Sequence, residues 1–190
     1  MPKILAINGS PKPEGNTAQM LQTVLDVCAG AGFETEMYQA GKREVRGCMA
    51  CGGCVKHKGR CAIDDWVNEV YEKMVAADAI LLGSPTYFSN MTSETKAVID
   101  RCGYVSRSAG MAFSRKIGAA VSAVRRSGGN VTLASMQYFF LINDMIMPGS
   151  SYWNMSLSLR AGDYQKDDEG IKTMKRLGEN IVWLSEKLGE

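Results

Sequence analysis

A short apolar segment near the start of the chain leads directly into a glycine-rich turn, and this junction limits the possible folds most. Residues 3–8 (KILAIN) have the composition of a buried strand, and residues 9–17 (GSPKPEGNT) precede the first helical pattern. A strand, a glycine-rich turn and a helix N-terminus often form a phosphate site, because the turn offers amide groups and the helix end carries about half a positive charge. The junction therefore predicts an anion site after the first strand.

The turn lacks two widespread phosphate-loop patterns. It contains neither G-x-x-x-x-G-K-[ST] nor G-x-G-x-x-G, which disfavours a triphosphatase and a dinucleotide site. The remaining interpretation is a site for a mononucleotide phosphate, with side-chain donors on Ser10, Asn16 and Thr17 and with Asn16 as N-cap. The same residues could instead serve only the geometry of a strand-to-helix turn, and this alternative stays open.

Strand and helix patterns alternate along the rest of the chain. Further strands are expected at 33–39, 78–83, 116–124 and 150–157, and helices at 16–30, 64–77, 92–105, 131–147 and 167–188. This alternation predicts an α/β fold, with a doubly wound, five-stranded parallel sheet and helices on both faces. The length of 190 residues and the lack of a linker predict a single domain over residues 1–190.

The polar and glycine-rich loops follow the first, third and fourth expected strands. In a flavodoxin-like strand order, 2-1-3-4-5, these loops converge beside the switch point between strands one and three, where α/β sheets bind ligands. Three candidate binding loops at one sheet edge support a ligand site better than any one loop.

Composition gives further limits. The net charge of +2 indicates neither a nucleic-acid partner nor a membrane partner, and no apolar segment reaches transmembrane length. Without a signal-peptide pattern we expect a cytoplasmic protein with reduced thiols, so the six cysteines predict metal-binding, reactive or packing residues rather than disulfides. Cys28 and Cys102 lie on apolar helical stripes and are expected in the core.

Four cysteines gather in the segment 45–62. Cys48, Cys51, Cys54 and Cys61 have the spacing C-x2-C-x2-C-x6-C, which favours an iron–sulfur cluster because thiolates at intervals of three residues can surround a compact centre. Structural zinc, or a loop without metal, remains an alternative. The sole histidine, His57, is left without a role. The acidic pair that follows, at 64–65, is expected to cap the next helix.

With both loops in view, the sequence resembles the iron–sulfur flavoprotein family within the flavodoxin-like FMN reductases. The resemblance rests on residues 9–17, the four cysteines before the acidic pair, the SPTYF segment at 84–88 and the SGG loop at 127–129. It implies FMN at the strand ends, a 4Fe-4S cluster on the cysteines, and a homodimer or homotetramer in which the cluster of one subunit lies near the flavin of its neighbour.

The resemblance also implies roles for individual residues. Those expected at the FMN phosphate are Ser10, Lys12, Asn16, Thr17 and Ala18. Those expected at the isoalloxazine ring are Pro85, Thr86, Tyr87 and Phe88, and those expected on its far side or at the ribityl chain are Ser122, Gly128 and Gly129. The sequence departs from the family pattern in Lys12, where Arg is usual, and in Asn130-Val131 after the SGG loop.

The implied function is a redox flavoprotein that transfers electrons between a donor, such as ferredoxin or NAD(P)H, and an acceptor. Since the cofactors carry the chemistry, no catalytic acid or base is expected. One alternative is an NAD(P)H-dependent FMN or quinone reductase whose cysteine loop is zinc-bound or metal-free. A second alternative is a non-enzymatic thiol redox sensor.

Overall fold

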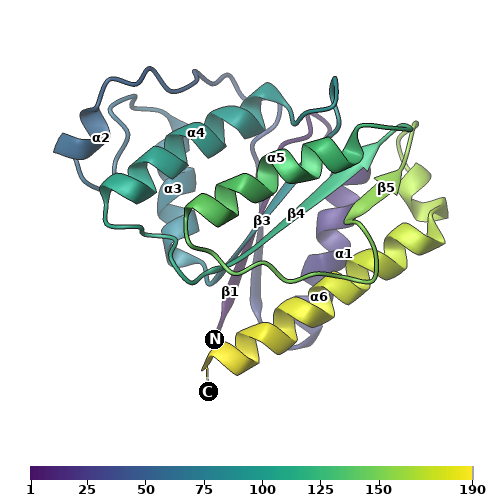
Figure 1. The fold of residues 1–190 in the computed structure, drawn as a ribbon. Coiled ribbons are helices and arrows are strands. Elements are labelled where there is room, and N and C mark those ends of the chain that lie inside the picture. Colours follow the sequence, from purple (N-terminus) through teal and green to yellow (C-terminus); the bar gives the residue numbers. More distant parts are fainter. Residues whose placement is uncertain (190) are drawn as a thin grey trace.

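The computed structural model describes residues 1–189, and a five-stranded parallel sheet in the order β2-β1-β3-β4-β5 lies at its centre (Figure 1). The strands are β1 (Lys3–Asn8), β2 (Glu34–Gln39), β3 (Ala79–Pro85), β4 (Ile117–Val124) and β5 (Met155–Leu157). The helices are α1 (Asn16–Gly30), α2 (Gly53–Lys56), α3 (Trp66–Ala76), α4 (Ser93–Ser108), α5 (Gly129–Ile142), the 3-10 helix η1 (Asp163–Lys166) and α6 (Asp168–Gly189). The predicted fold class and strand order are confirmed.

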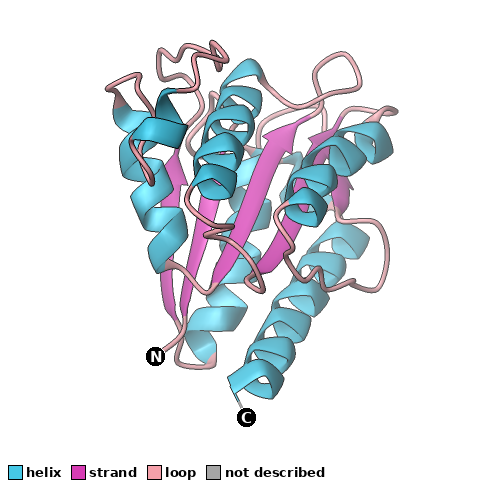
Figure 2. Ribbon diagram, turned by 60° about the vertical axis from the view of Figure 1, so that its left-hand side comes forward, coloured by secondary structure: helices cyan, strands magenta, loops and turns pink. Residues whose placement is uncertain are grey.

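Helices cover both faces of the sheet, with α3, α4 and α5 on one face and α1 and α6 on the other (Figures 1 and 2). Side chains of β1 alternate between two apolar clusters because successive residues of a strand point to opposite faces. Leu5 and Ile7 join the cluster under α3, α4 and α5, while Ile4 and Ala6 join the cluster under α1 and α6. The central strands are therefore buried on both sides.

Two predicted boundaries were wrong near the end of the sheet. The helix expected at 131–147 ends at Ile142, since Asp144 is left-handed and Ile146 pairs with the start of β4, accepting from the Gly118 amide at 2.9 Å. The strand expected at 150–157 is limited to Met155–Leu157, because β4 offers β5 a ladder only over residues 122–124. The segment 143–154 is consequently a loop.

The two cysteines expected in the core are both fully buried. Cys28 packs in the cluster under α1 and α6, and Cys102 packs in the cluster on the other face of the sheet. Burial disfavours a thiolate, which raises the pKa of Cys28 to about 11 and raises that of Cys102 further. These thiols are packing residues, as predicted.

Candidate functional site

The loops after β1, β3 and β4 are joined at the carboxyl edge of the sheet. The amide of Gly9 donates to the carbonyl of Gly83 at 2.8 Å, and the hydroxyl of Thr92 donates to the carbonyl of Gly9 at 2.8 Å. The amide of Thr86 donates to the carbonyl of Ala123 at 2.9 Å, which joins the loop after β3 to β4. The expected convergence of the three loops is thus present.

The turn after β1 has the features of an anion cradle. Ser10 is buried, its amide donates to Asn8 Oδ1 at 3.1 Å, and its hydroxyl accepts from the Lys12 amide at 3.2 Å. Helix α1 begins at Asn16 with Gly15 as its N-cap, and no side chain caps it. Since the first amides of a helix have no partner within the helix, those of residues 16–18 are free to meet an anion.

The prediction that Asn16 caps α1 was wrong. Its side-chain nitrogen donates to the carbonyl of Arg160 at 2.8 Å, and its oxygen accepts from the amides of Gly162 at 3.0 Å and Tyr164 at 3.3 Å. These contacts fasten the segment after β5 to the start of α1. Asn16 therefore has its backbone amide, rather than its side chain, to offer an anion, whereas Thr17 and Ala18 lie buried in the same turn.

The loop after β3 forms a narrow turn with exposed aromatic side chains. Tyr87 and Asn90 exchange backbone hydrogen bonds of 2.8 and 3.0 Å, and Phe88 and Ser89 between them are both left-handed, with φ of 49° and 59°. Phe88 is fully exposed and Tyr87 is half exposed. An apolar ring that is so open to water is a candidate for contact with a ligand or a second chain.

The loop after β4 packs closely against this turn. Gly128 is left-handed, and a Cβ built on it would lie 2.6 Å from Ser89 Oγ, so glycine permits the approach. Gly129, the next residue, is the first of α5. Ser122 lies within β4 rather than in the loop; it is buried, and its hydroxyl is 2.9 Å from that of Thr86. Through this contact Ser122 helps to hold the loop after β3 against β4.

Sequence reasoning missed the contribution of the residues after β2. Gln39 accepts from Asn8 Nδ2 at 2.6 Å and donates to the carbonyl of Ser10 at 2.7 Å. A Cβ on Gly41 would lie 2.1 Å from that same Ser10 oxygen, so a side chain there would collide with the anion turn. A glycine two residues after the end of the second strand was the sequence signal that could have identified this support.

The four cysteines of the segment 45–62 line one cavity of about 240 Å³, together with Arg101, Tyr104 and Val105 of α4. Cys48 and Cys51 are exposed, and Cys54 and Cys61 are half-buried. Within residues 1–189, no three His, Cys, Asp or Glu side chains are close enough to hold a metal ion. The structure thus brings the four cysteines to one cavity without arranging them as a finished ligand set, and His57 does not line it.

Side chains of α3 and α4 hold the second half of this segment. Asn68 accepts from the Cys61 amide at 2.9 Å and donates to the carbonyls of Cys61 at 3.3 Å and Ile63 at 3.0 Å. The hydroxyl of Ser108 donates to the carbonyl of Cys54 at 3.0 Å. The half that contains Cys54 and Cys61 is therefore fixed to the fold, while the exposed half extends outward.

The carboxylate of Asp65 links α3 to α4 beneath the cysteine segment. It accepts from the Val67 amide at 3.0 Å, which confirms its predicted capping role, and both oxygens accept from the Arg101 guanidinium at 2.7 Å. Burial opposes its ionisation, but these hydrogen bonds outweigh burial and hold the pKa of Asp65 below its ordinary value. Asp64 does not cap the helix and pairs instead with Arg60 at 2.5 Å.

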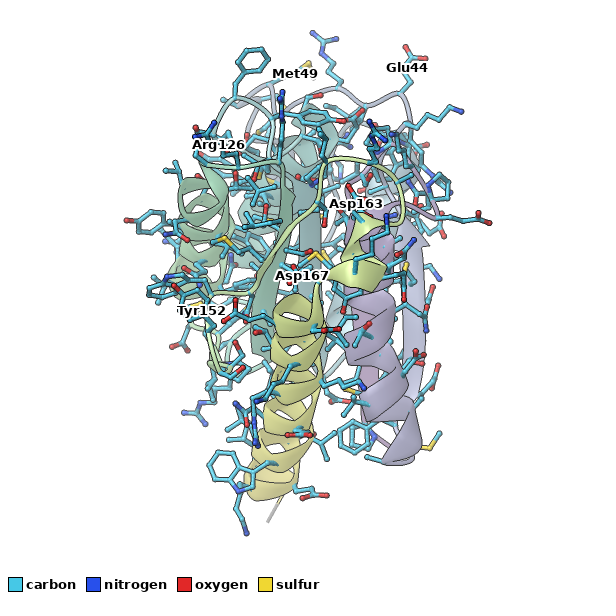
Figure 3. All side chains as sticks on the ribbon, turned by 90° about the vertical axis from the view of Figure 1, so that its right-hand side faces the viewer. Glu44, Met49, Arg126, Tyr152, Asp163 and Asp167 are labelled. Atoms are coloured by element: carbon cyan, nitrogen blue, oxygen red, sulfur yellow. The ribbon has the colours of Figure 1, made fainter. Side chains whose placement is uncertain are left out.

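The anion turn and the cysteine segment lie at the same end of the molecule. Figure 3 shows Glu44, which directly precedes the cysteine segment, and Met49, which lies within it, at the end of the molecule that also carries Arg126 from the loop after β4. The cavity of the cysteines is nevertheless lined by no residue of the loops 9–18, 85–90 or 122–129. Within one chain, the cysteine cavity therefore shares no lining residue with the three loops.

Comparisons with known proteins show what the chain is similar to. Residues 2–159 match the family model described as NADPH-dependent FMN reductase. The chain is 36% identical over 189 residues to an iron-sulfur flavoprotein of Methanocaldococcus jannaschii, covering 95% of each chain, and 36% identical over 187 residues to one of Methanosarcina thermophila, covering 94% of this chain and 93% of that one. The fold matches a flavodoxin from the domain Archaea with a TM-score of 0.64 at 16% identity, over 99% of each chain.

The described part of the chain, residues 1–189, contains no helix that is long and apolar enough to span a bilayer.

Proposed function

The chain belongs to the NADPH-dependent FMN reductase family, and on this premise we propose that it is an FMN-dependent oxidoreductase that also carries a 4Fe-4S cluster on its cysteine segment. FMN and an oxidoreductase activity follow from the family. The cluster, the residues that hold each cofactor and the redox partners are the proposal. The observation that carries it is the single cavity lined by Cys48, Cys51, Cys54 and Cys61.

The turn after β1 suits the FMN phosphate. Uncapped amides of residues 16–18, the hydroxyls of Ser10 and Thr17 and the nearby Lys12 together supply neutral donors and a positive charge. Lysine holds a phosphate as a point charge, without the paired hydrogen bonds of an arginine. The turn therefore fixes one end of the cofactor largely through its backbone.

The two loops beside this turn suit the ring of FMN. Pro85, Thr86, Tyr87 and Phe88 would supply backbone amides and aromatic surface, with the aromatic side chains limiting access of water. Gly128 and Gly129 would permit close approach from the other side, and Ser122 would keep the first loop in place through Thr86. These roles use the close contact between the loops after β3 and β4.

The donor set of the cysteine segment suits an iron–sulfur cluster. Four thiols line the cavity, and two of their sulfurs already accept hydrogen bonds at 3.4 Å, Cys48 from the Ala50 amide and Cys61 from Arg101 Nε. Such hydrogen bonds to sulfur are one of the means by which proteins set a cluster's potential. When bound, a cluster supplies one-electron transfer and FMN supplies one- or two-electron transfer.

The relatives support the same proposal. Both of the similar proteins described above are named iron-sulfur flavoproteins. The family name indicates NAD(P)H as an electron donor; ferredoxin is a second donor class that we infer from the resemblance, together with a homodimer or homotetramer. In such an assembly, the cysteine cavity of one chain would face the flavin loops of its neighbour.

Anaerobic analysis of iron, acid-labile sulfide and flavin, with an absorption spectrum, tests the proposal. We expect about four iron and four sulfide per chain, as a 4Fe-4S cluster requires, and one FMN. Replacing Cys48, Cys51, Cys54 and Cys61 by Ser should remove the iron and keep the FMN, whereas Cys28→Ala, on the opposite face of the sheet, should keep both. Absence of iron and sulfide from the parent protein after reconstitution would overturn the cluster.

A second candidate is an NAD(P)H-dependent FMN or quinone reductase whose cysteine segment holds zinc or no metal. The observation in favour of its metal-free form is that no three candidate ligands within residues 1–189 are close enough for a metal. This reductase would reduce its flavin with NAD(P)H at the parent rate after all four cysteines become Ser. Under the leading proposal, the same variant loses electron transfer that depends on the cluster.

A further inference from the structure

Arg101 of α4 is a buried cation whose five donors are all used at the base of the cysteine segment. Its Nε donates to Cys61 Sγ at 3.4 Å, and its two terminal nitrogens donate to the two oxygens of Asp65 at 2.7 Å each. The same terminal nitrogens donate to the carbonyls of Arg46 at 3.2 Å and Ile63 at 3.1 Å. No donor is left for solvent.

These contacts connect the two ends of the cysteine segment through one side chain. Arg46 precedes Cys48 by two residues and Ile63 follows Cys61 by two residues, so the four cysteines lie between the two carbonyls that Arg101 holds. The guanidinium also lines the cavity that the cysteines share. A planar group with donors in fixed directions suits this task, whereas lysine would bring a single mobile point charge.

We propose that Arg101 is a positioning residue of the cysteine site, which holds Cys61 as a cluster ligand and makes the cluster easier to reduce. The proposal rests on the proposed function, because it requires a cluster on the cysteines. A buried positive charge that donates a hydrogen bond to a ligand sulfur stabilises the added negative charge of the reduced cluster. The pair with Asp65 is by itself weak evidence of a stabilising role, since buried ion pairs are often replaceable by apolar residues without loss of stability.

Asp65 carries the charge opposite to that of Arg101. Substitutions that neutralise the two residues should therefore shift the reduction potential of the cluster in opposite directions. Replacing Arg101 by Gln leaves the Asp65 carboxylate uncompensated near the cavity and removes the donor to Cys61 Sγ, so reduction becomes harder. Asp65→Asn leaves the guanidinium uncompensated and makes reduction easier, while Asn keeps an acceptor for the Val67 amide and remains a good N-cap. Simple disruption of the site would move both variants in the same direction.

The test is a redox titration of the anaerobically reconstituted protein, followed by absorbance and electron paramagnetic resonance, with iron and sulfide analysis of each sample. At a fixed poise, we expect Arg101→Gln to lower the ratio of reduced to oxidised cluster at least tenfold, equivalent to about 59 mV. Asp65→Asn should raise that ratio. Arg101→Lys keeps the charge, so its ratio of reduced to oxidised cluster should lie between those of Arg101→Gln and the parent. The control is Arg107→Gln, which removes an exposed charge from the same helix and should match the parent.

Each outcome has a distinct meaning. A parent protein without iron and sulfide overturns the proposed function and this inference with it. A parent with a cluster whose potential is unchanged in both Arg101→Gln and Asp65→Asn, or shifted in the same direction in both, overturns the inference alone. Should Arg101→Gln fail to fold or to retain iron, Asp65→Asn still decides it: a raised ratio of reduced to oxidised cluster supports the inference, and an unchanged or lowered ratio overturns it.

Discussion

Glu36, on the edge strand β2, lies between Lys3 of β1 and Lys73 of α3. This arrangement makes the stability of the protein depend on pH in a specific way. The oxygens of Glu36 are 2.7 Å from Lys73 Nζ and 3.3 Å from Lys3 Nζ. The hydrogen bond from Lys73, aided by Lys3, outweighs burial and holds the pKa of Glu36 below its ordinary value. A carboxyl with a depressed pKa stabilises the folded state above its unfolded pKa of about 4.3 and loses that effect as the pH falls.

We therefore expect Glu36→Gln to lower the free energy of unfolding by about 0.5–1 kcal/mol at pH 7, as measured by urea denaturation at low salt. The difference from the parent should shrink as the pH falls below about 4.3, because the Glu36 carboxyl becomes protonated and then resembles the neutral Gln. Glu179→Gln, which removes an exposed partner of Arg176 on α6, serves as the control and should show no comparable change. A difference that persists unchanged at pH 3 would contradict this assignment.

At the scale of elements, the end of β2 is the support of the anion turn. The Cβ of an alanine at position 41 would lie 2.1 Å from the carbonyl oxygen of Ser10 and 2.7 Å from that of Gly9. Both are backbone atoms, which cannot rotate away. We expect Gly41→Ala to cost about 1–3 kcal/mol of stability and to weaken FMN binding at least tenfold, about 1.4 kcal/mol.

Gly47→Ala is the matched control for this experiment. It adds the same methyl group six residues later, where no atom lies within 4 Å, and should change stability by no more than about 0.5 kcal/mol. Flavin fluorescence quenching measures the affinity, and urea denaturation measures the stability. Equal FMN affinity in the two variants would show that the contact between β2 and the turn does not support the cofactor.

The elements themselves were largely predictable from the sequence, and the contacts between them were not. Periodicity predicted α1, because Met20, Leu21, Val24 and Leu25 lie on one buried stripe. It could not predict that Asn16 turns toward residues 160–164, since those partners are about 145 positions away and lie in an irregular segment. The helix expected at 131–147 extends past the end of α5 at Ile142, because the extended segment that follows α5 is as apolar in sequence as the end of the helix.

The candidate site follows the same rule. The phosphate turn and the cysteine spacing are local patterns, so sequence reasoning could propose both. Arg101 was missed, as it occurs in an ordinary amphipathic helix and acquires its importance only when α4 is packed against the cysteine segment. Gln39 was missed for a similar reason, because only the pairing of β1 with β2 brings it to Asn8 and Ser10. The roles of both residues depend on contacts between segments that are distant in the sequence, which local patterns do not show.

At the scale of the whole molecule, the two candidate sites occupy one end of the fold but depend on different elements. The loops proposed to bind FMN are joined through β1, β3 and β4, while the cysteine segment is held by α3 and α4. No residue of the loops 9–18, 85–90 or 122–129 lines the cysteine cavity. Binding of FMN by one chain should therefore proceed without a cluster.

This independence predicts how FMN stabilises the protein. A ligand that binds only the folded state raises the free energy of unfolding by about 2.7 kcal/mol at 100 times its Kd. We expect that increase in the parent and also in the variant with Ser at positions 48, 51, 54 and 61, compared at one free FMN concentration, 100 times the Kd of the parent, and at one protein concentration. Urea denaturation of the cluster-free proteins under anaerobic conditions measures it. If the Ser variant gained markedly less stability than the parent at this FMN concentration, the cysteine segment would have to contribute to FMN affinity, because an independent site has the same Kd in both proteins.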